Sequence, residues 1–341
     1  MKVFYSETHR EHQPPFEVFD GGLRTPYLEN PNRMDQILSA LHSVDWARVI
    51  PPLDFGLTPI LAVHDRAYVD FLASAWTEWL DTHPEDPSTL IPATFALRRI
   101  PQIPKSILGR AGYYIMDLSA GIVEGTYQTA LASANCDLSA AQTIAESEDR
   151  SVFALCRPPG HHAGKDYAGG YCFINNAAVA ANWLSSKGKV AILDIDYHAG
   201  NGTQDIFYER DDVLTVSIHA DPDFEYPNYI GFADERGNGL GNGFHHNFPL
   251  PRGTDDTSYL STLDRAVDLI REFNPAYLVV SAGMDIYTDD PLGTFEVTTD
   301  GIAGIGRRIV ALDLPSVIVM EGGYANEMLG KNILAFLGEL K

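Results

Sequence analysis

The chain has 341 residues, an apolar fraction of 45% and a formal net charge of -22. Length and composition of this kind are typical of a globular, enzyme-sized protein with ample material for a packed core. So acidic a surface repels nucleic acid and attracts polycations, which excludes a nucleic-acid binder. The three cysteines form no CxxC pair, which argues against a disulfide framework and a thiolate zinc site.

The acidic surface and the apolar pattern bear on location and habitat. No apolar run approaches the ~20 residues that span a bilayer, and the N-terminus lacks an apolar signal segment, so we expect a cytoplasmic protein without membrane contact. Two explanations of the charge stay open. It keeps the protein soluble in a salt-rich, halophilic cytosol, or it also steers a cationic substrate toward the site.

Apolar periodicity predicts strands that alternate with helices along most of the chain. A loop containing Glu17 is expected between the first strand and the first helix. This alternation predicts one α/β domain over 1–341, with a mostly parallel central sheet, helices on both faces, and a site beyond the carboxyl ends of the strands. The expected strands are 1–6, 152–156, 190–193, 213–218, 276–281 and 316–320, and the expected helices are 31–41, 63–80, 129–148, 177–184, 261–273 and 301–311.

A proline-rich segment at about 80–107 interrupts this alternation. Its five prolines between residues 81 and 104 exclude a long helix, and its apolar residues argue against simple disorder. Long loops inside a compact domain are usually functional. We therefore expect a packed or interface-forming insertion.

Acidic residues and a histidine follow the strand 190–193 directly. In an extended segment alternate side chains share a face, so Asp194, Asp196 and His198 are expected to project together. Two carboxylates and an imidazole are typical ligands of a hard or borderline cation. The alternative, acids that cap a following helix, accounts for one Asp but not for the Asp-x-Asp-x-His pattern.

Three further strands end in reactive residues. His161 and His162 follow the strand 152–156 after a rigid Pro-Pro-Gly turn, Asp285 follows 276–281, and Tyr324 follows 316–320. Together they predict a hydrolytic metal site. Asp196, His198 and Asp285 bind the ion, one histidine removes a proton from water, and Tyr324 donates a hydrogen bond to the oxyanion.

Five ordered motifs carry a family resemblance: RPPGHHA, GGYCFINN, DIDYHAGNGTQ, SAGMD and EGGY. In this order and spacing the chain resembles the histone deacetylase superfamily, and specifically its bacterial acetylpolyamine amidohydrolase branch. The resemblance covers almost the whole chain. It implies an arginase-like α/β fold and zinc-dependent hydrolysis of an acetamide to acetate and a free amine.

The resemblance also implies roles for individual residues. Asp196, His198 and Asp285 become the ligands of one zinc ion, for which Fe²⁺ or Co²⁺ can substitute. His162 becomes the general base, His161 its electrostatic partner or acid, and Tyr324 the residue that polarises the carbonyl.

Supporting roles follow from the same motifs. Asp194 is expected to accept a hydrogen bond from His161. A structural K⁺ site is implied, and Asn201 lies beside His162, where a neutral partner leaves the base less basic. The residues implied for the K⁺ site are Asp194, Asp196, His198, Ser217 and Ile218.

The resemblance further implies a narrow acyl tunnel with aromatic walls at Tyr171 and Tyr226 and a substrate contact at Gly170. Glu17 and Asp117 are candidate partners of a distal substrate ammonium, with solvated surface acids as the alternative. Relatives acting on small polyamines carry an insertion like 80–107, which builds a homodimer interface and narrows the entrance.

We therefore predict a zinc amidohydrolase acting on small cationic acetylated polyamines such as acetylputrescine and acetylcadaverine. The alternative substrate class is acetyl-lysine in proteins or peptides. An arginase-type ureohydrolase with two manganese ions is disfavoured because the tandem histidines and Tyr324 have no task there. A binding or sensor protein that merely kept the fold is disfavoured because all six reactive positions are present.

Overall fold

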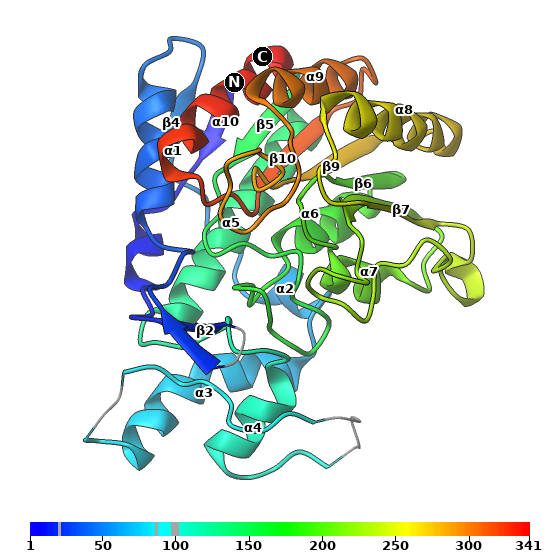
Figure 1. Ribbon diagram of the computed structural model, residues 1–341. Helices are drawn as coiled ribbons and strands as arrows, with labels where there is room; N and C mark the ends of the chain where they lie inside the picture. Colours follow the sequence, from blue (N-terminus) through cyan, green and yellow to red (C-terminus); the bar gives the residue numbers. More distant parts are fainter. Residues whose placement is uncertain (20–21, 86–87, 97–101) are drawn as a thin grey trace.

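A sheet of eight parallel strands forms the centre of the computed structural model (Figure 1). The structure describes residues 1–19, 22–85, 88–96 and 102–341. The strand order is β4-β1-β5-β10-β9-β6-β7-β8. The bounds are β1 Lys2–Phe4, β4 Arg48–Ile50, β5 Ser151–Ala154, β6 Val190–Asp194, β7 Val213–Ala220, β8 His245–Leu250, β9 Tyr277–Ala282 and β10 Ser316–Met320.

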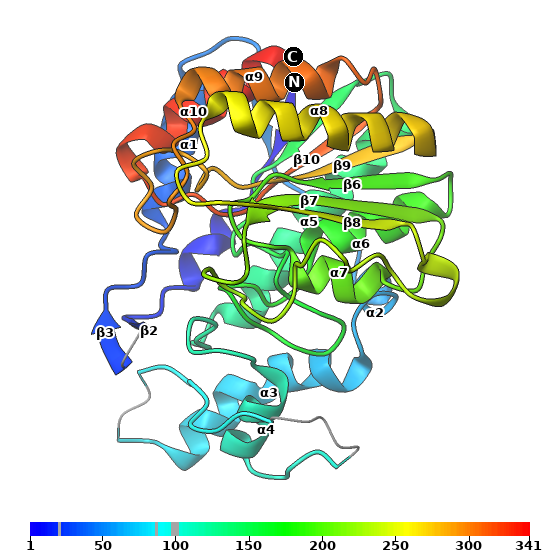
Figure 2. The same cartoon turned by 45° about the vertical axis from the view of Figure 1, so that its right-hand side comes forward.

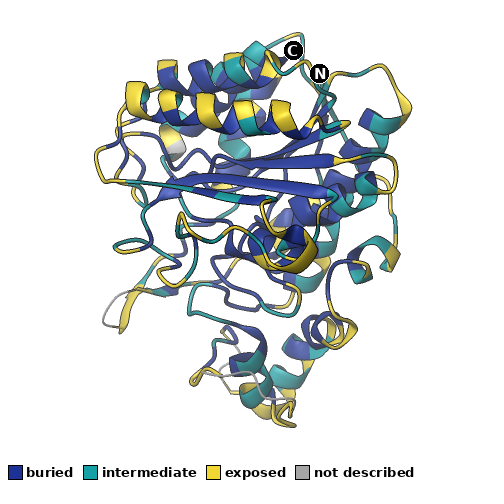
Figure 3. Cartoon of the chain, turned by 90° about the vertical axis from the view of Figure 1, so that its right-hand side faces the viewer, coloured by how far each residue is buried: buried dark blue, intermediate teal, exposed yellow. Residues whose placement is uncertain are grey.

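Helices cover both faces of this sheet, so its central strands are buried along nearly their whole length and are mainly apolar. Figure 2 shows α1 (Asn32–His42), α8 (Asp256–Phe273), α9 (Thr299–Val310) and α10 (Asn326–Leu340) on one face. The other face carries α5 (Thr126–Glu146), α6 (Asn176–Ser185) and α7 (Asn201–Phe207). Successive side chains of a strand enter opposite cores: Leu278 and Val280 pack with the first set of helices and Val279 with the second. Buried strands between helices with exposed outer surfaces are visible in Figure 3.

The predicted α/β architecture is confirmed, with differences at its margins. The expected loop around Glu17 contains an antiparallel hairpin, β2 (Glu17–Phe19) and β3 (Leu23–Thr25). The edge strands β4 and β8 were not predicted. β4 has only three residues, and β8 carries polar residues such as His245 and Asn247, so neither shows a clear apolar pattern.

The segment predicted as an insertion joins α3 (Arg66–Thr82) to α4 (Ile107–Tyr114), in a lobe at some distance from the sheet (Figures 1 and 2). Residues 86–87 and 97–101, which include the Arg-Arg-Ile-Pro sequence of this segment, lie outside the described residues. The short helix α2 (Thr58–Leu61) precedes α3. Among the helices of the described ranges, none has the length and apolar character needed to cross a membrane.

Candidate active site

The predicted catalytic residues meet at the carboxyl ends of β5, β6, β9 and β10, which lie side by side in the sheet. A cavity of about 760 Å³ opens there. Its wall includes His161, His162, Asp196, His198 and Tyr324. Loops at the carboxyl ends of parallel strands are the usual position of sites in this fold class. Catalytic residues as far apart in the sequence as His161 and Tyr324 thus share one cavity.

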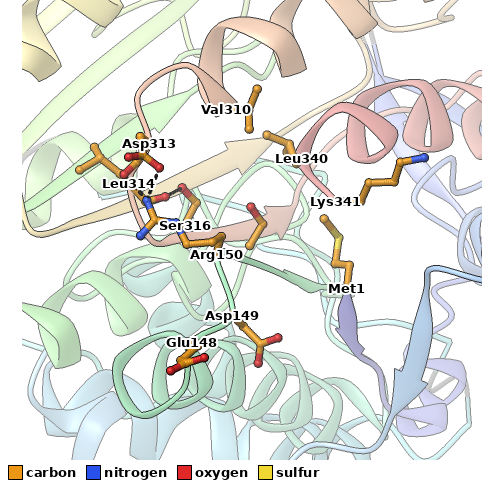
Figure 4. A pocket seen from close by; sticks show the side chains of 11 residues that line it. Met1, Glu148, Asp149, Arg150, Val310, Asp313, Leu314, Ser316, Leu340 and Lys341 are labelled. Carbon is orange, nitrogen blue, oxygen red and sulfur yellow. Dashed lines mark hydrogen bonds and ion pairs between the residues drawn. The ribbon is translucent and has the colours of Figure 1, made fainter.

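A second cavity, of about 380 Å³, lies at the opposite ends of the strands (Figure 4). It is lined near the starts of β5 and β10, by Ser151 and Ser316. Its Arg150 side chain is 2.7 Å from the carboxylate of Asp313, so these two charges are paired with each other. The reactive residues identified from the sequence are all elsewhere, and the first cavity is therefore the candidate site.

Asp196, His198 and Asp285 form a cluster with the geometry of a metal site. Nδ1 of His198 is 3.3 Å from Oδ1 of Asp196 and 3.1 Å from Oδ2 of Asp285. Ligand bonds of about 2.0–2.1 Å in a tetrahedral zinc site place ligand atoms about 3.3 Å apart, so this donor set fits. Backbone amides hold both carboxylates: Gly322 N–H donates to Asp196 and Tyr197 N–H donates to Asp285.

The charge of this cluster also fits a cation. Asp196 and Asp285 are fully buried. Burial, followed by the charge of Asp196, raises the pKa of Asp285 to about 7. Burial opposes protonation of His198, but its hydrogen bonds to Asp196 and Asp285 outweigh burial and raise its pKa to about 10. The raised pKa of His198 reflects the negative charge of two buried carboxylates beside it, and a divalent ion bound among the three side chains would offset that charge.

The tandem histidines have opposite electrostatic surroundings. Burial and the charges of His161 and His198 lower the pKa of His162 well below its ordinary value. Burial also disfavours the charged form of His161, but Asp196 and Asp194 outweigh it and raise the pKa of His161 well above its ordinary value. Nδ1 of His161 is 3.0 Å from Asp194. These surroundings therefore favour the charged form of the His161 imidazole and the neutral form of the His162 imidazole.

The hydrogen bond to Asn201 determines the tautomer of the neutral His162 imidazole. Its Nδ1 lies 2.7 Å from the side-chain oxygen of Asn201, which can only accept, so Nδ1–H donates and Nε2 carries the free lone pair. The pKa of His162 is lowered by burial and by the charges of His161 and His198, whereas its hydrogen bond to Asn201 works in the opposite direction. The predicted effect of Asn201 on the basicity of His162 stays a prediction.

Tyr324 is held by contacts that the sequence did not indicate. Its backbone N–H donates to the buried carboxylate of Asp290 at 2.6 Å, and the N–H of Ala325 donates to the same oxygen at 2.8 Å. From the other side, the buried Arg33 donates to the carbonyls of Glu321 (2.5 Å) and Gly323 (2.7 Å). Gly323 has φ +121°, which an L-side chain rarely adopts, so the loop depends on glycine here.

Glu321 is a further residue that sequence reasoning missed. It is fully buried and accepts hydrogen bonds from the backbone N–H groups of Gly160 (2.6 Å) and His161 (3.2 Å). It thereby links the loop of Tyr324 to the tandem histidines. Its position beside Gly322 and Gly323 was a signal for it, whereas a charged residue such as Arg33 near the start of an amphipathic helix carries no sequence signal of burial.

The predicted tunnel walls line the cavity. Tyr226 stands perpendicular to His162, with ring centroids 4.9 Å apart, and Tyr171 lies 5.7 Å from the ring of Tyr324. Gly170 also lines the cavity and has φ +52°. A side chain there is excluded, because its Cβ would lie 2.2 Å from the His162 ring.

The two candidate ammonium partners differ in position. Asp117 lines the cavity and accepts hydrogen bonds from Gly170 N–H (2.6 Å) and the Tyr226 hydroxyl (2.8 Å). Glu17 is only 1% exposed and does not belong to the cavity wall. It accepts from the Tyr171 hydroxyl at 2.5 Å and from Leu28 N–H at 2.7 Å. Glu17 is therefore neither a solvated loop acid nor a wall residue, because the β2–β3 hairpin turns it inward behind Tyr171.

The residues assigned to a K⁺ site lie next to the metal cluster. Asp194 and Ser217 are register partners on β6 and β7, and Ile218 follows on β7. Nε2 of His219 lies 2.8 Å from the Gly231 carbonyl and must donate to it, so its Nδ1 accepts from the Ser217 hydroxyl at 2.7 Å. This leaves the lone pairs of the Ser217 hydroxyl available to a cation.

Comparisons with known proteins agree with this geometry. Residues 27–340 match the family model described as histone deacetylase domain. The chain is 47% identical to acetylpolyamine amidohydrolase 1 of Pseudomonas aeruginosa, over 99% of this chain and 98% of that protein. It is 42% identical to acetylpolyamine amidohydrolase of Mycoplana ramosa, over 98% of this chain and 97% of that protein.

A solved structure shows the same fold. The crystal structure of an acetylpolyamine aminohydrolase from Burkholderia pseudomallei superposes with a TM-score of 0.95 at 41% identity, covering 99% of this chain and 98% of that chain. The predicted arginase/deacetylase-like fold and a hydrolytic deacetylase activity are thereby confirmed. On its motifs, its fold and its full-length similarity, the chain belongs to the histone deacetylase family.

Proposed function

We propose that this protein hydrolyses the acetamide of acetylated polyamines to acetate and a free amine, with zinc at Asp196, His198 and Asp285. The observation that carries the chemistry is that the metal-binding cluster and His162 share one cavity. The hydrogen bond from Nδ1 of His162 to Asn201 leaves Nε2 of His162 free to accept a proton. The names of relatives that are similar over their full length support the substrate class. The net charge of -22 supports a cationic substrate.

The metal supplies Lewis-acid chemistry when bound, lowering the pKa of a water and polarising the acyl carbonyl. The residues of the chain complete the reaction. Nε2 of His162 accepts the proton of the attacking water and later delivers it to the leaving amine. His161 stays cationic through Asp194 and stabilises negative charge that develops beside it.

Tyr324 is the hydrogen-bond donor to the oxyanion in this proposal. Burial raises the pKa of its phenol well above the ordinary value, so the hydroxyl remains protonated and able to donate. The walls of Tyr171 and Tyr226 admit a linear acylated chain and exclude bulkier groups. The neighbouring residues Asp194 and Ser217 support a structural K⁺.

The substrate class is tested by comparing kcat/KM for acetylputrescine with kcat/KM for an acetyl-lysine peptide, using the zinc-loaded enzyme. We expect the diamine to be preferred, because the acidic cavity attracts an ammonium and the narrow walls exclude a peptide. A strong preference for the peptide would overturn the polyamine assignment and favour the acetyl-lysine alternative.

Asp290→Asn is expected to lower kcat about tenfold with little change in KM, as for residues that orient catalytic groups through hydrogen bonds. The variant keeps the side-chain shape but weakens the acceptor for the N–H groups of Tyr324 and Ala325. Steady-state kinetics of Asp290→Asn, Tyr324→Phe and the double variant check this. If Asp290 acts through Tyr324, the double variant loses little more than Tyr324→Phe alone, whereas additive losses contradict it. Asp289→Asn, an exposed neighbour, is the matched control.

We also propose a homodimer through the segment predicted as an insertion. Its described part and the adjoining α4 expose the apolar side chains of Phe95, Ile103 and Leu108. Exposed apolar residues gathered in one segment favour an interaction surface.

A further inference from the structure

The wall of the active-site cavity carries few charged groups outside the metal cluster and the tandem histidines. Among the described residues these are Asp117, Glu225 and Arg252. A linear substrate with an ammonium at its far end requires an anion along this wall. The hydrogen bonds of the two carboxylates show which of them is available.

Asp117 is already engaged by the protein. One carboxylate oxygen accepts from the backbone N–H groups of Ser119 (3.0 Å) and Ala120 (3.2 Å), and the other accepts from Gly170 and Tyr226. Four donors therefore share its two oxygens. This arrangement suits a residue that fixes the tunnel wall, because an ammonium would have to compete with donors that hold Gly170 and Tyr226 in place.

Glu225 is bonded quite differently. Its side chain is 18% exposed and lines the cavity directly before the wall residue Tyr226. Within the part of the chain that the structure describes, its carboxylate pairs with the guanidinium of Arg252 through a single contact of 3.3 Å. Charge-assisted hydrogen bonds are usually about 2.7–2.9 Å long and Arg pairs are often bidentate, so this contact is loose.

Arg252 is positioned to leave that contact. Its side chain is 59% exposed, and it also touches the Phe224 carbonyl at 3.2 Å and the Phe224 ring at 4.6 Å. An ion pair this exposed adds little stability. Glu225 thus already holds a cation at the cavity wall, and that cation can move into solvent while keeping its contacts with Phe224.

We propose that Glu225 binds the distal ammonium of the substrate, a protonated amine on a linear chain, and that the ammonium displaces the guanidinium of Arg252. This inference rests on the proposed function and adds the residue that selects a cationic tail. A compact ammonium with three donors can bond a carboxylate that a single long guanidinium contact leaves undersatisfied.

The test measures kcat/KM for acetylputrescine and for N-butylacetamide, which has a similar linear chain without the amine. Glu225→Gln is expected to lower kcat/KM for acetylputrescine by about tenfold or more, mainly through KM, as for a lost hydrogen bond to a charged group. The value for N-butylacetamide is expected to stay within about twofold. Arg252→Gln is expected to raise kcat/KM for acetylputrescine several-fold, because it removes the competing cation.

Asp223→Asn is the matched control, since it removes one negative charge from an exposed residue of the same loop outside the cavity wall. The change in kcat/KM for Asp223→Asn measures the contribution of the overall electrostatic field of the protein alone. Equal losses on both substrates in Glu225→Gln, or a loss on acetylputrescine in Arg252→Gln, would overturn this inference while the deacetylase reaction stands. Failure of the unmodified enzyme to hydrolyse acetylputrescine would instead overturn the proposed function, and this subsite with it. Zinc content and melting temperature confirm that each variant is folded.

Discussion

Asp285→Asn is expected to reduce the zinc content well below one ion per chain and to lower kcat/KM by about 10³-fold. A Lewis acid contributes several kcal/mol of transition-state stabilisation, and each ~1.4 kcal/mol is about a factor of ten in rate. The substitution preserves the side-chain shape. It replaces one of the two carboxylate oxygens of Asp285, of which Oδ2 lies 3.1 Å from Nδ1 of His198, with an amide nitrogen. Elemental analysis and steady-state kinetics on the same sample measure both effects.

Two controls separate loss of metal from loss of structure. Asp289→Asn removes the same charge from an exposed residue of the same loop and should keep both metal and activity. Chelation of the wild-type enzyme should abolish activity, and added Zn²⁺ should restore it. Full activity in metal-free Asp285→Asn would exclude the proposed metal chemistry altogether.

Tyr324→Phe is expected to retain zinc and substrate binding but to lower kcat by about 10²–10³-fold, the usual cost of one oxyanion donor. The phenyl ring preserves the contact with Tyr171 and with the Arg33 guanidinium, which lies 4.7 Å from the Tyr324 ring centroid. Only the hydroxyl is lost, and it acts chiefly in the transition state, so KM should change little. Single-turnover kinetics separate this chemical step from product release.

Tyr229→Phe is the matched control, because Tyr229 is 93% exposed and does not line the cavity. It should leave kcat unchanged. Near-normal turnover by Tyr324→Phe would remove Tyr324 from the mechanism. A parallel fall in zinc content would instead assign the loop of Tyr324 a role in holding Asp196, to which Gly322 N–H donates.

The β2–β3 hairpin and the edge strands β4 and β8 were not predicted from the sequence. Apolar runs such as 276–281 and 316–320 predicted central strands because a strand covered on both faces must be apolar throughout. The edge strand β8 lacks that signal. The sequence predicts a loop where the β2–β3 hairpin lies, and the inward turn of Glu17 depends on its contact with Tyr171, 154 positions away.

The sequence alone determined the alternation of strands and helices and the reactive residues at four strand ends, because periodicity and residue chemistry are local properties. Family motifs then separated Asp194 from the ligands Asp196, His198 and Asp285. Only the tertiary structure decided which groups hold these residues: Arg33 and Asp290 around Tyr324, Glu321 beneath the tandem histidines, and the loose pair of Glu225 and Arg252 at the cavity wall. Such partners are brought together by chain packing, so no spacing in the sequence reveals them.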